Sequence, residues 1–373
     1  MISSSPIAIT GMAWSTALGD DLDAVWQRLL ACETGLAPVP HTPRLRNSLG
    51  AACASPSLDL PAAERMTAIG VPTLRRALAD AGRDAAGAHM VLGTSLGAFL
   101  EGEPDSAPLN KWADTIAAAV GAAPPVSLST ACSSGSDAIL VGAELIRAGV
   151  TDWVICGGVD VLTITKRLAH SSLGSMSPTT LRTFDERHDG TLLGEGAGFV
   201  ILETTDAAAA RGKKPLALLR GVGSANDAAG MTTPDAAGLG ARYALERSLA
   251  DAGIGAGEIA VINAHGSGTP LNDATEAMAF RDVFGGKGNP IVFGTKGNFG
   301  HSLGATGTIE AIAVLLALRT QKVPPVYGLE QPYPALTFPV PQGEPLACEG
   351  RYGLSLTLGF GGFDTSLVFE VVR

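Results

Sequence analysis

One local pattern occurs twice along the chain, and it limits the possible folds more than any other feature. A short apolar run passes through small residues directly into a long apolar helix, first over residues 126–148 and again over residues 291–318. A helix that is apolar on nearly every face has to be buried on most sides. Two such units favour two similar halves built from strands and helices over two unrelated domains.

The rest of the chain continues this alternation of strands and helices. Short apolar runs, which are typical of buried strands, occupy residues 7–11, 89–94, 153–159, 199–203, 216–222, 259–264, 352–358 and 366–371. Periodic apolar positions indicate further helices over residues 22–31, 62–81, 111–120 and 240–252. The sequence therefore predicts an α/β fold, with one half at residues 1–207 and the other at residues 208–373.

A glycine run at residues 194–198 is superficially similar to a dinucleotide-binding loop. The next residues, 199–203, form an apolar run typical of a strand. A phosphate-binding loop has to lead into a helix N-terminus, so we expect no nucleotide site there.

The composition limits the class of protein. Hydrophobic residues make up 46% of the 373 residues and charged residues only 17%, so a large buried core is expected. The net charge of −10 argues against nucleic acid as a general partner, because phosphate binding needs a basic surface. No Lys or Arg precedes Arg28, and the longest apolar stretch, residues 311–318, is too short to span a bilayer. These features predict a cytoplasmic protein without a membrane span.

The five cysteines are widely spaced and lack any C-x-x-C pair, which predicts reduced thiols and no metal site. Cys132 stands where a short strand breaks into the first apolar helix. At a helix N-terminus, unpaired backbone N–H groups and the helix dipole favour the thiolate, which is the nucleophilic form. Cys132 is therefore a candidate for covalent catalysis, and the alternative is a small buried hydrophobic residue.

Two histidines lie in glycine-rich segments. His265 follows a buried strand, and His301 precedes the second apolar helix. Open α/β sheets gather ligands beyond the carboxyl ends of their strands, so these two side chains can meet at one site. The alternative for each is a hydrogen-bonded core or surface residue, which is the only interpretation that we give to His41, His89 and His170.

Taken together, five separated segments resemble the β-ketoacyl carrier-protein synthase family in their order and approximate spacing. They comprise residues 130–135 (TACSSG), 184–198, 263–270 (NAHGSGTP), 296–307 and 359–362 (GFGG). The resemblance spans essentially the whole chain. It implies a thiolase-like fold, in which two similar βαβαβ-type halves form a layered αβαβα sandwich.

The resemblance also implies a decarboxylative Claisen condensation with Cys132, His265 and His301 as catalytic residues. Cys132 would take an acyl group from the phosphopantetheine arm of an acyl carrier protein. Malonyl-carrier protein would then lose carbon dioxide and attack this thioester as an enolate, whose oxygen would accept hydrogen bonds from the Nε atoms of both histidines. Either histidine could orient a water for decarboxylation. No bound cofactor is implied beyond the carrier's own arm.

Supporting roles follow from the same resemblance. The backbone N–H groups of Cys132 and Phe360 would form an oxyanion hole, and the Phe360 ring would gate the acyl pocket. Lys296 would hold the catalytic network together and bias its charge.

The resemblance assigns a second set of residues to positioning and substrate binding. Glu276 and Glu310 would support the site structurally, because a buried carboxylate needs partners. Ser267 and Thr269 would bind the pantetheine amides. Ser267 replaces the usual Thr, so the hydroxyl is retained and the methyl group is lost.

The surface that would dock the carrier protein departs from the family pattern. His188 stands where the family usually has Arg in this surface. The cationic candidates for docking that we name instead are Arg65, Lys166, Arg167, Arg182, Arg187, Lys213 and Lys214.

The acyl pocket also departs from the family pattern. Residues 93–132 form a shorter segment than is typical, and Phe363 and Asp364 are unusual beside the glycine-rich loop. These departures suggest a specialised type II fatty-acid or polyketide pathway, polyene assembly included. The alternatives are a housekeeping fatty-acid elongation synthase and a chain-length-determining or otherwise non-elongating partner subunit.

A thiolase is disfavoured because the closing loop carries no second Cys. A homodimer or a heterodimer with a second ketosynthase-like subunit is expected, with its seam near residues 93–127.

Overall fold

The computed structural model describes residues 6–101 and 108–372. Ten of the described strands form one sheet, in the order β10-β9-β13-β14-β8-β1-β7-β6-β4-β5. The first half of the chain supplies β1 (Ile7–Ser15), β4 (His89–Gly93), β5 (Val126–Leu128), β6 (Trp153–Asp160) and β7 (Gly196–Thr204). The second half supplies β8 (Ala217–Asn226), β9 (Ile259–Asn263), β10 (Ile291–Phe293), β13 (Tyr352–Gly359) and β14 (Phe363–Val371).

The two halves of the sheet have the same topology. In the first, β5, β4 and β6 run parallel, and β7 and β1 follow antiparallel. In the second, β10, β9 and β13 run parallel, and β14 and β8 follow antiparallel. The halves join through a short antiparallel pairing of β1 with β8, which confirms the predicted pair of similar α/β halves.

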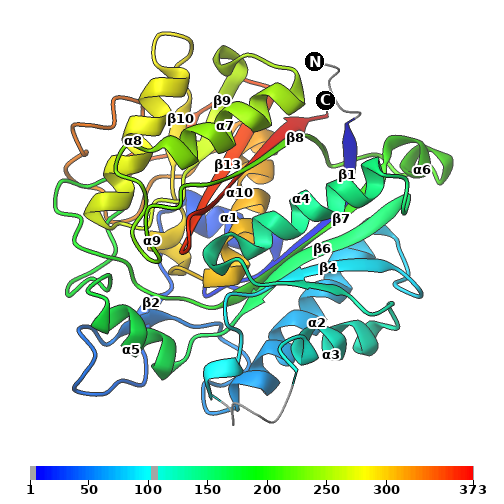
Figure 1. Cartoon of the computed structure of the whole chain (residues 1–373), viewed down its shortest axis with the longest axis horizontal. Coiled ribbons are helices and arrows are strands. Elements are labelled where there is room, and N and C mark those ends of the chain that lie inside the picture. Colours follow the sequence, from blue (N-terminus) through cyan, green and yellow to red (C-terminus); the bar gives the residue numbers. More distant parts are fainter. Residues whose placement is uncertain (1–5, 102–107, 373) are drawn as a thin grey trace.

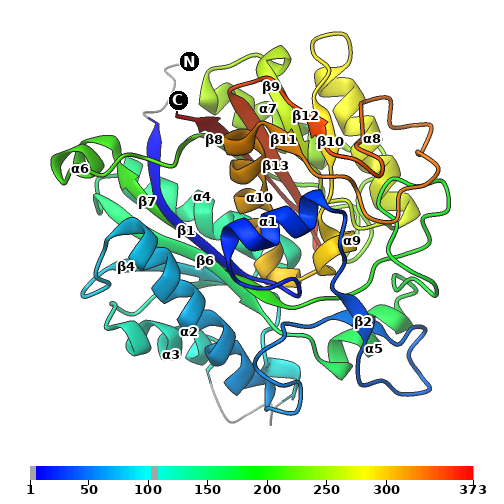
Figure 2. The same cartoon turned by 180° about the vertical axis from the view of Figure 1, so that it is seen from behind.

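Helices form the other layers of the sandwich (Figure 1). The central layer holds α4 (Ser134–Arg147) and α10 (Thr306–Thr320), which pack on each other and each contact strands of both half-sheets. The outer faces carry α2 (Ala62–Ala81) with α3 (Lys111–Val120) on one side, and α7 (Leu239–Ala252) with α8 (Pro270–Phe284) on the other (Figure 2). This is the αβαβα arrangement that the resemblance implied.

Shorter elements connect the layers. They are α1 (Leu22–Leu30), α5 (Ile164–Ser172), α6 (Thr205–Ala210), α9 (Lys296–Phe299), the two-stranded pairs β2 (Leu36–Pro38) with β3 (Leu49–Ala51) and β11 (Lys322–Val323) with β12 (Leu346–Ala347), and the 3-10 turns η1 (Phe99–Glu101), η2 (Ala131–Ser133), η3 (Ala256–Glu258) and η4 (Leu303–Ala305). Neither α5 nor α8 was among the expected helices. The expected boundary between residues 207 and 208 falls inside α6 and stays a prediction.

Helix α10 belongs to the core of the protein. Every residue from Thr306 to Leu318 is buried. Residues 303–320 are long and apolar enough to cross a membrane, but 89% of this stretch is buried inside the protein. The apolar side chains of α10 therefore pack between the two half-sheets.

The two junctions that lead into the central helices have the same local geometry. Ala131 and Leu303 adopt left-handed φ angles of 52° and 50°, a conformation that costs energy for residues other than Gly, and each begins a 3-10 turn followed by the helix. The helix starts meet closely, because a Cβ atom on Gly135 would lie 2.9 Å from the carbonyl oxygen of Gly304. A Cβ atom on Gly307 would lie 2.0 Å from Ser136 Oγ. Small residues are thus required where the two halves touch.

Candidate active site

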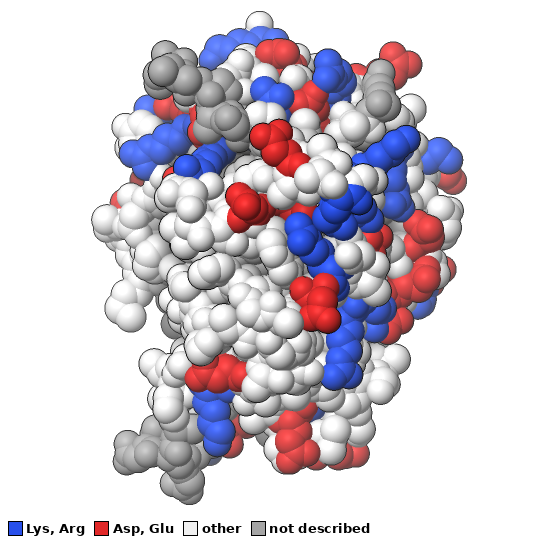
Figure 3. Space-filling view, turned by 90° about the vertical axis from the view of Figure 1, so that its right-hand side faces the viewer, with Lys and Arg blue, Asp and Glu red and all other residues white. Residues whose placement is uncertain are grey.

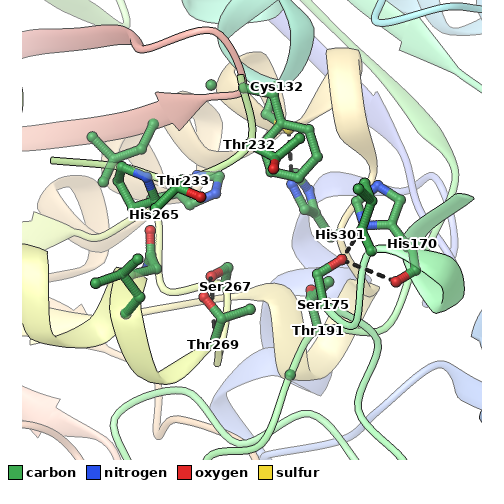
Figure 4. A pocket seen from close by; sticks show the side chains of 18 of the residues that line it. Cys132, His170, Ser175, Thr191, Thr232, Thr233, His265, Ser267, Thr269 and His301 are labelled. Atoms are coloured by element: carbon green, nitrogen blue, oxygen red, sulfur yellow. Dashed lines mark hydrogen bonds between the residues drawn. The ribbon is translucent and has the colours of Figure 1, made fainter. Parts of the chain in front are cut away.

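The meeting of the two helix starts brings the predicted nucleophile to the predicted histidines. Cys132 lies in η2, is 4% exposed and lines a cavity of about 330 Å³ together with His265 and His301. The Nε2 atom of His301 lies 3.1 Å from Cys132 Sγ. The two imidazole rings meet edge to face, with centroids 5.1 Å apart and an interplanar angle of 81° (Figure 4).

The hydrogen bonds of His301 determine which ring nitrogen carries the proton. The backbone N–H of Leu303 donates to Nδ1 over 3.2 Å, so Nδ1 is an acceptor and the proton of the neutral ring sits on Nε2. Burial and the nearby Lys296 charge hold the pKa of His301 well below its usual range. The Nε2–H group therefore points at the sulfur from a neutral ring.

His265 is held mainly through its backbone. It directly follows β9, and its N–H donates to Glu276 Oε1 over 2.7 Å. Its carbonyl oxygen accepts a hydrogen bond from Lys296 Nζ. Burial and the Lys296 charge also hold the pKa of His265 well below its usual range.

A buried ion pair lies behind the histidines. Lys296, the first residue of α9, donates to Glu310 Oε1 of α10 over 2.6 Å. Burial raises the pKa of Glu310 to about 7, and Lys296 opposes this shift. Burial likewise raises the pKa of Glu276 to about 8, although this carboxyl accepts the backbone N–H groups of His265 and Gly266.

The pKa of the Cys132 thiol differs from the sequence-based expectation. Burial raises it to about 12, which outweighs the lowering effects of the Lys296 charge and of a hydrogen bond from the backbone N–H of Phe360. The expectation that the helix start favours the thiolate was therefore wrong in its net direction, because the sulfur is removed from water. The Phe360 N–H nevertheless donates to the sulfur, so it lies beside the nucleophile, where the resemblance places an oxyanion-hole donor.

The mouth of the cavity carries several hydroxyl groups. Ser267 Oγ lies 3.0 Å from Thr269 Oγ1, and both residues line the cavity. Sequence reasoning missed other hydroxyl-bearing lining residues, which come from separate segments: Ser175, Thr191, Thr232 and Thr233. These residue types are too common to stand out in a sequence, so only the fold reveals their convergence (Figure 4).

His170 is a further lining residue that we had interpreted as an ordinary core or surface histidine. It lies on α5, and its ring stacks on the Phe360 ring with centroids 5.6 Å apart and an interplanar angle of 21°. Burial and the Lys166 charge lower the pKa of His170 to about 4.

Three of the predicted docking residues are buried, and their assignment to a docking surface was wrong. Arg65 pairs with Glu195, and Lys166 pairs with Asp160. Arg167 donates to backbone carbonyl groups. Side chains that are 2–3% exposed cannot form a docking surface, because these buried partners hold their charges inside the protein.

The remaining docking candidates lie in two places. Arg182 donates to Thr179 Oγ1, and Arg187 pairs with Asp185 in the same segment, which leads to the cavity. Lys213 and Lys214 lie shortly after α6, which both ribbon views show far from α5 (Figures 1 and 2). His188, at the position where the family usually has Arg, is 8% exposed and bonds to a buried aspartate.

No group of three or more His, Cys, Asp or Glu side chains within residues 6–101 and 108–372 could hold a metal ion. The site is instead a cavity with one thiol, two neutral imidazoles and a backbone N–H donor at the junction of two similar half-sheets. This arrangement defines the class as a thiolase-like condensing enzyme fold.

Comparison with known proteins identifies the family. The β-ketoacyl synthase N-terminal domain matches residues 4–208, and the β-ketoacyl synthase C-terminal domain matches residues 216–330. The chain therefore belongs to the β-ketoacyl synthase family, whose members are acyltransferases.

Relatives and solved structures agree with this assignment. A 3-oxoacyl-[acyl-carrier-protein] synthase 2 of Synechocystis sp. is 31% identical over 98% of this chain and 97% of the relative. One of the same name from Mycobacterium bovis is 35% identical over 68% of this chain, and this match spans only 61% of the relative's length. The ishigamide ketosynthase/chain length factor is 26% identical, with a TM-score of 0.88 over 99% of this chain and 100% of that chain.

Proposed function

We propose that the protein condenses an acyl group bound to Cys132 with malonyl-carrier protein, giving a β-ketoacyl-carrier protein and carbon dioxide. The observation that carries this proposal is the approach of His301 Nε2 to Cys132 Sγ in a cavity shared with His265. A backbone N–H of Phe360 directed at the same sulfur supports it.

The first step transfers the acyl group. Cys132 Sγ attacks the thioester carbonyl of an acyl carrier protein, and the N–H groups of Cys132 and Phe360 stabilise the oxyanion of the tetrahedral intermediate. The proton that Cys132 gives up is taken by the carrier's phosphopantetheine sulfur, which leaves as a thiol. The amides of the phosphopantetheine arm bind the hydroxyl groups of Ser267 and Thr269 in the cavity.

The second step forms the carbon–carbon bond. When malonyl-carrier protein loses carbon dioxide, negative charge develops on the thioester oxygen of the enolate. Neutral histidines stabilise this charge by donating from Nε2, and the Leu303 N–H holds His301 in the tautomer that can do so. The enolate carbon then attacks the acyl thioester and releases Cys132. Lys296 holds the backbone of His265 in position.

We place the reaction in a specialised type II fatty-acid or polyketide pathway. The hydroxyl groups and the extra imidazole in the cavity support a substrate other than a plain saturated chain. Similarity to a ketosynthase/chain length factor supports the same assignment. The presence of Cys132, His265 and His301 favours an active subunit over a non-elongating partner.

We further propose that the protein works as a dimer and in the cytoplasm. Strand β5 ends the sheet, and Val126 on it is 45% exposed, so a second subunit can pair with this edge. Leu96 and Leu109, which also belong to the proposed seam, are 46% and 71% exposed. The part of the seam at residues 102–107 lies outside the described residues. One side of the molecule shows a broad area with few charged side chains beside a band of Lys and Arg (Figure 3), and a face with few charges suits the centre of a protein interface.

The test is acyl loading followed by condensation. The protein is incubated with acyl carrier proteins that bear different acyl groups, and the mass of the peptide containing Cys132 is measured. Malonyl-carrier protein is then added, and formation of the β-ketoacyl product is followed. Loading that is lost in Cys132→Ala and retained in Cys32→Ala supports the proposal. Full condensation by Cys132→Ala contradicts it.

A further inference from the structure

His170 connects the loop that carries Phe360 to a wall of the cavity that the proposed reaction does not use. Its ring stacks on the ring of Phe360, whose backbone N–H points at Cys132 Sγ. The side chain is 8% exposed and lines the same cavity as Cys132. An acyl chain attached to Cys132 therefore shares this cavity with the His170 ring.

The hydrogen bonds of His170 leave one ring nitrogen unused. Ser175 Oγ donates to the carbonyl oxygen of His170 over 3.2 Å. Because Ser175 has a single hydroxyl proton, its contact of 3.0 Å with Nδ1 makes Nδ1 the donor. Nε2 is then a lone-pair acceptor, and it has no hydrogen-bond partner among the residues that the structure describes.

Thr191 contributes a second unused polar atom to the lining of the same cavity. Its backbone N–H donates to the carbonyl oxygen of Ser175 over 2.8 Å, so the two residues are neighbours. Thr191 is 3% exposed and lines the cavity, and its hydroxyl has no hydrogen-bond partner among the described residues. Figure 4 shows Ser175 and Thr191 on the same side of the cavity as His170.

These atoms differ from the polar groups that hold the rest of α5. Lys166, one turn earlier on the helix, donates to Asp160 and to the carbonyl oxygen of Val161. His170 has no acidic partner of this kind in the part of the chain that the structure describes. If His170 served only to stack on Phe360, an aromatic ring without a nitrogen acceptor would serve equally well. A stacking role would also leave the unpaired Thr191 hydroxyl unexplained.

We propose that His170 and Thr191 are specificity-determining residues that favour an acyl chain bearing a hydroxyl group. This inference rests on the proposed function, since it assumes that Cys132 carries the chain. A hydroxyl group can donate to the Nε2 lone pair of His170 and accept from the Thr191 hydroxyl, which satisfies both unused atoms together. A saturated chain would leave both atoms unpaired. Leaving a buried polar group unpaired disfavours the saturated chain by about 10- to 100-fold.

The test compares the loading of Cys132 by paired small-molecule thioesters. N-acetylcysteamine thioesters of a saturated acid, and of the same acid hydroxylated at carbon 3 or carbon 5, avoid any dependence on carrier docking. The rate constant for acyl-Cys132 formation is measured by mass spectrometry for each. We expect the better hydroxylated thioester to load about tenfold or more faster than the saturated one. In His170→Phe, which keeps the aromatic stack, the ratio should fall to about twofold or less.

Two further variants keep the result interpretable. Thr191→Val preserves the side-chain shape and should lower the same ratio, which provides a test if His170→Phe does not fold. His89→Phe changes an exposed histidine of β4 and should leave the ratio unchanged. The assignment is wrong if the wild type loads hydroxylated and saturated thioesters at nearly equal rates, or if both cavity variants keep the wild-type preference. Either result leaves the proposed function intact. Failure of every thioester and every acyl carrier protein to load wild-type Cys132 contradicts the proposed function itself.

Discussion

His301 Nε2 and Cys132 Sγ lie 3.1 Å apart although 169 positions separate the two residues in the chain. The contact results from the duplicated architecture, since each residue stands beside the start of a central helix and the two helix starts meet. His301 precedes the turn that begins at Leu303, and Cys132 follows Ala131 at the equivalent turn. The site therefore depends on how closely the two halves pack.

The reactivity of Cys132 should rise continuously with pH. Burial raises the pKa of this thiol to about 12, so the thiolate fraction grows about tenfold for each pH unit below that value. We expect the rate of iodoacetamide alkylation at Cys132 to increase from pH 6 to pH 9 without a plateau. Peptide mass spectrometry measures the rate. A plateau near pH 7 would instead indicate a preformed thiolate–imidazolium pair.

The buried Lys296–Glu310 pair should matter for stability as well as for activity. Removing one member leaves an uncompensated buried charge, which typically costs about 3–5 kcal/mol. We expect Lys296→Met to lower the free energy of unfolding by an amount of this order and to abolish condensation. The double variant Lys296→Met/Glu310→Leu should recover much of the stability and none of the activity. Urea unfolding measures the first quantity, and product formation measures the second. Recovery of activity in the double variant would contradict the assigned role of Lys296.

The duplicated junction tolerates no added side-chain volume. A Cβ atom on Gly307 would lie 2.0 Å from Ser136 Oγ, so Gly307→Ala should force α4 and α10 apart. Overpacking of this kind typically costs about 1–3 kcal/mol, and the displacement should also slow acyl loading at Cys132. Gly255→Ala is the matched control, since its Cβ atom would approach nothing closer than 3.9 Å at an ordinary φ of −83°. Equal unfolding midpoints for the two variants would contradict this account.

The fold, and the meeting of Cys132, His265 and His301 in one cavity, could be predicted from the sequence. The apolar runs mark the strands, and the short motifs around these three residues carry the resemblance to the family. The burial of Lys166 could not be predicted, because its partner Asp160 and the turn of α5 that faces it become visible only in three dimensions.

Helix α8 was missed for a related reason. Its buried side includes polar residues such as Asn272 and Glu276, so it has no apolar stripe. Glu276 accepts the backbone N–H groups of His265 and Gly266, and Asn272 donates to the side chains of Glu276 and Asp273. A polar residue that supports a site has the same appearance in a sequence as one on the surface.

Glu276 should give the stability of the protein a distinctive pH dependence. Burial raises its pKa to about 8 in the folded state, against about 4.5 for a free carboxyl, so the folded state binds one more proton than the unfolded state between these values. Stability therefore falls as the pH rises through this window. In Glu276→Gln this contribution is absent, so the free energy of unfolding of the wild type should decline relative to the variant from pH 5 to pH 8. Urea titrations at several pH values give the free energy of unfolding of each protein, and the slopes against pH are compared. The substitution also changes hydrogen bonds, but a loss of stability from that cause is the same at every pH and does not affect the slope. Glu64→Gln is the control, because Glu64 is exposed on α2, and its free energy of unfolding should have the wild-type pH slope. If the pH profiles of the wild type and of Glu276→Gln are parallel, Glu276 is ionised throughout this range and the prediction is wrong.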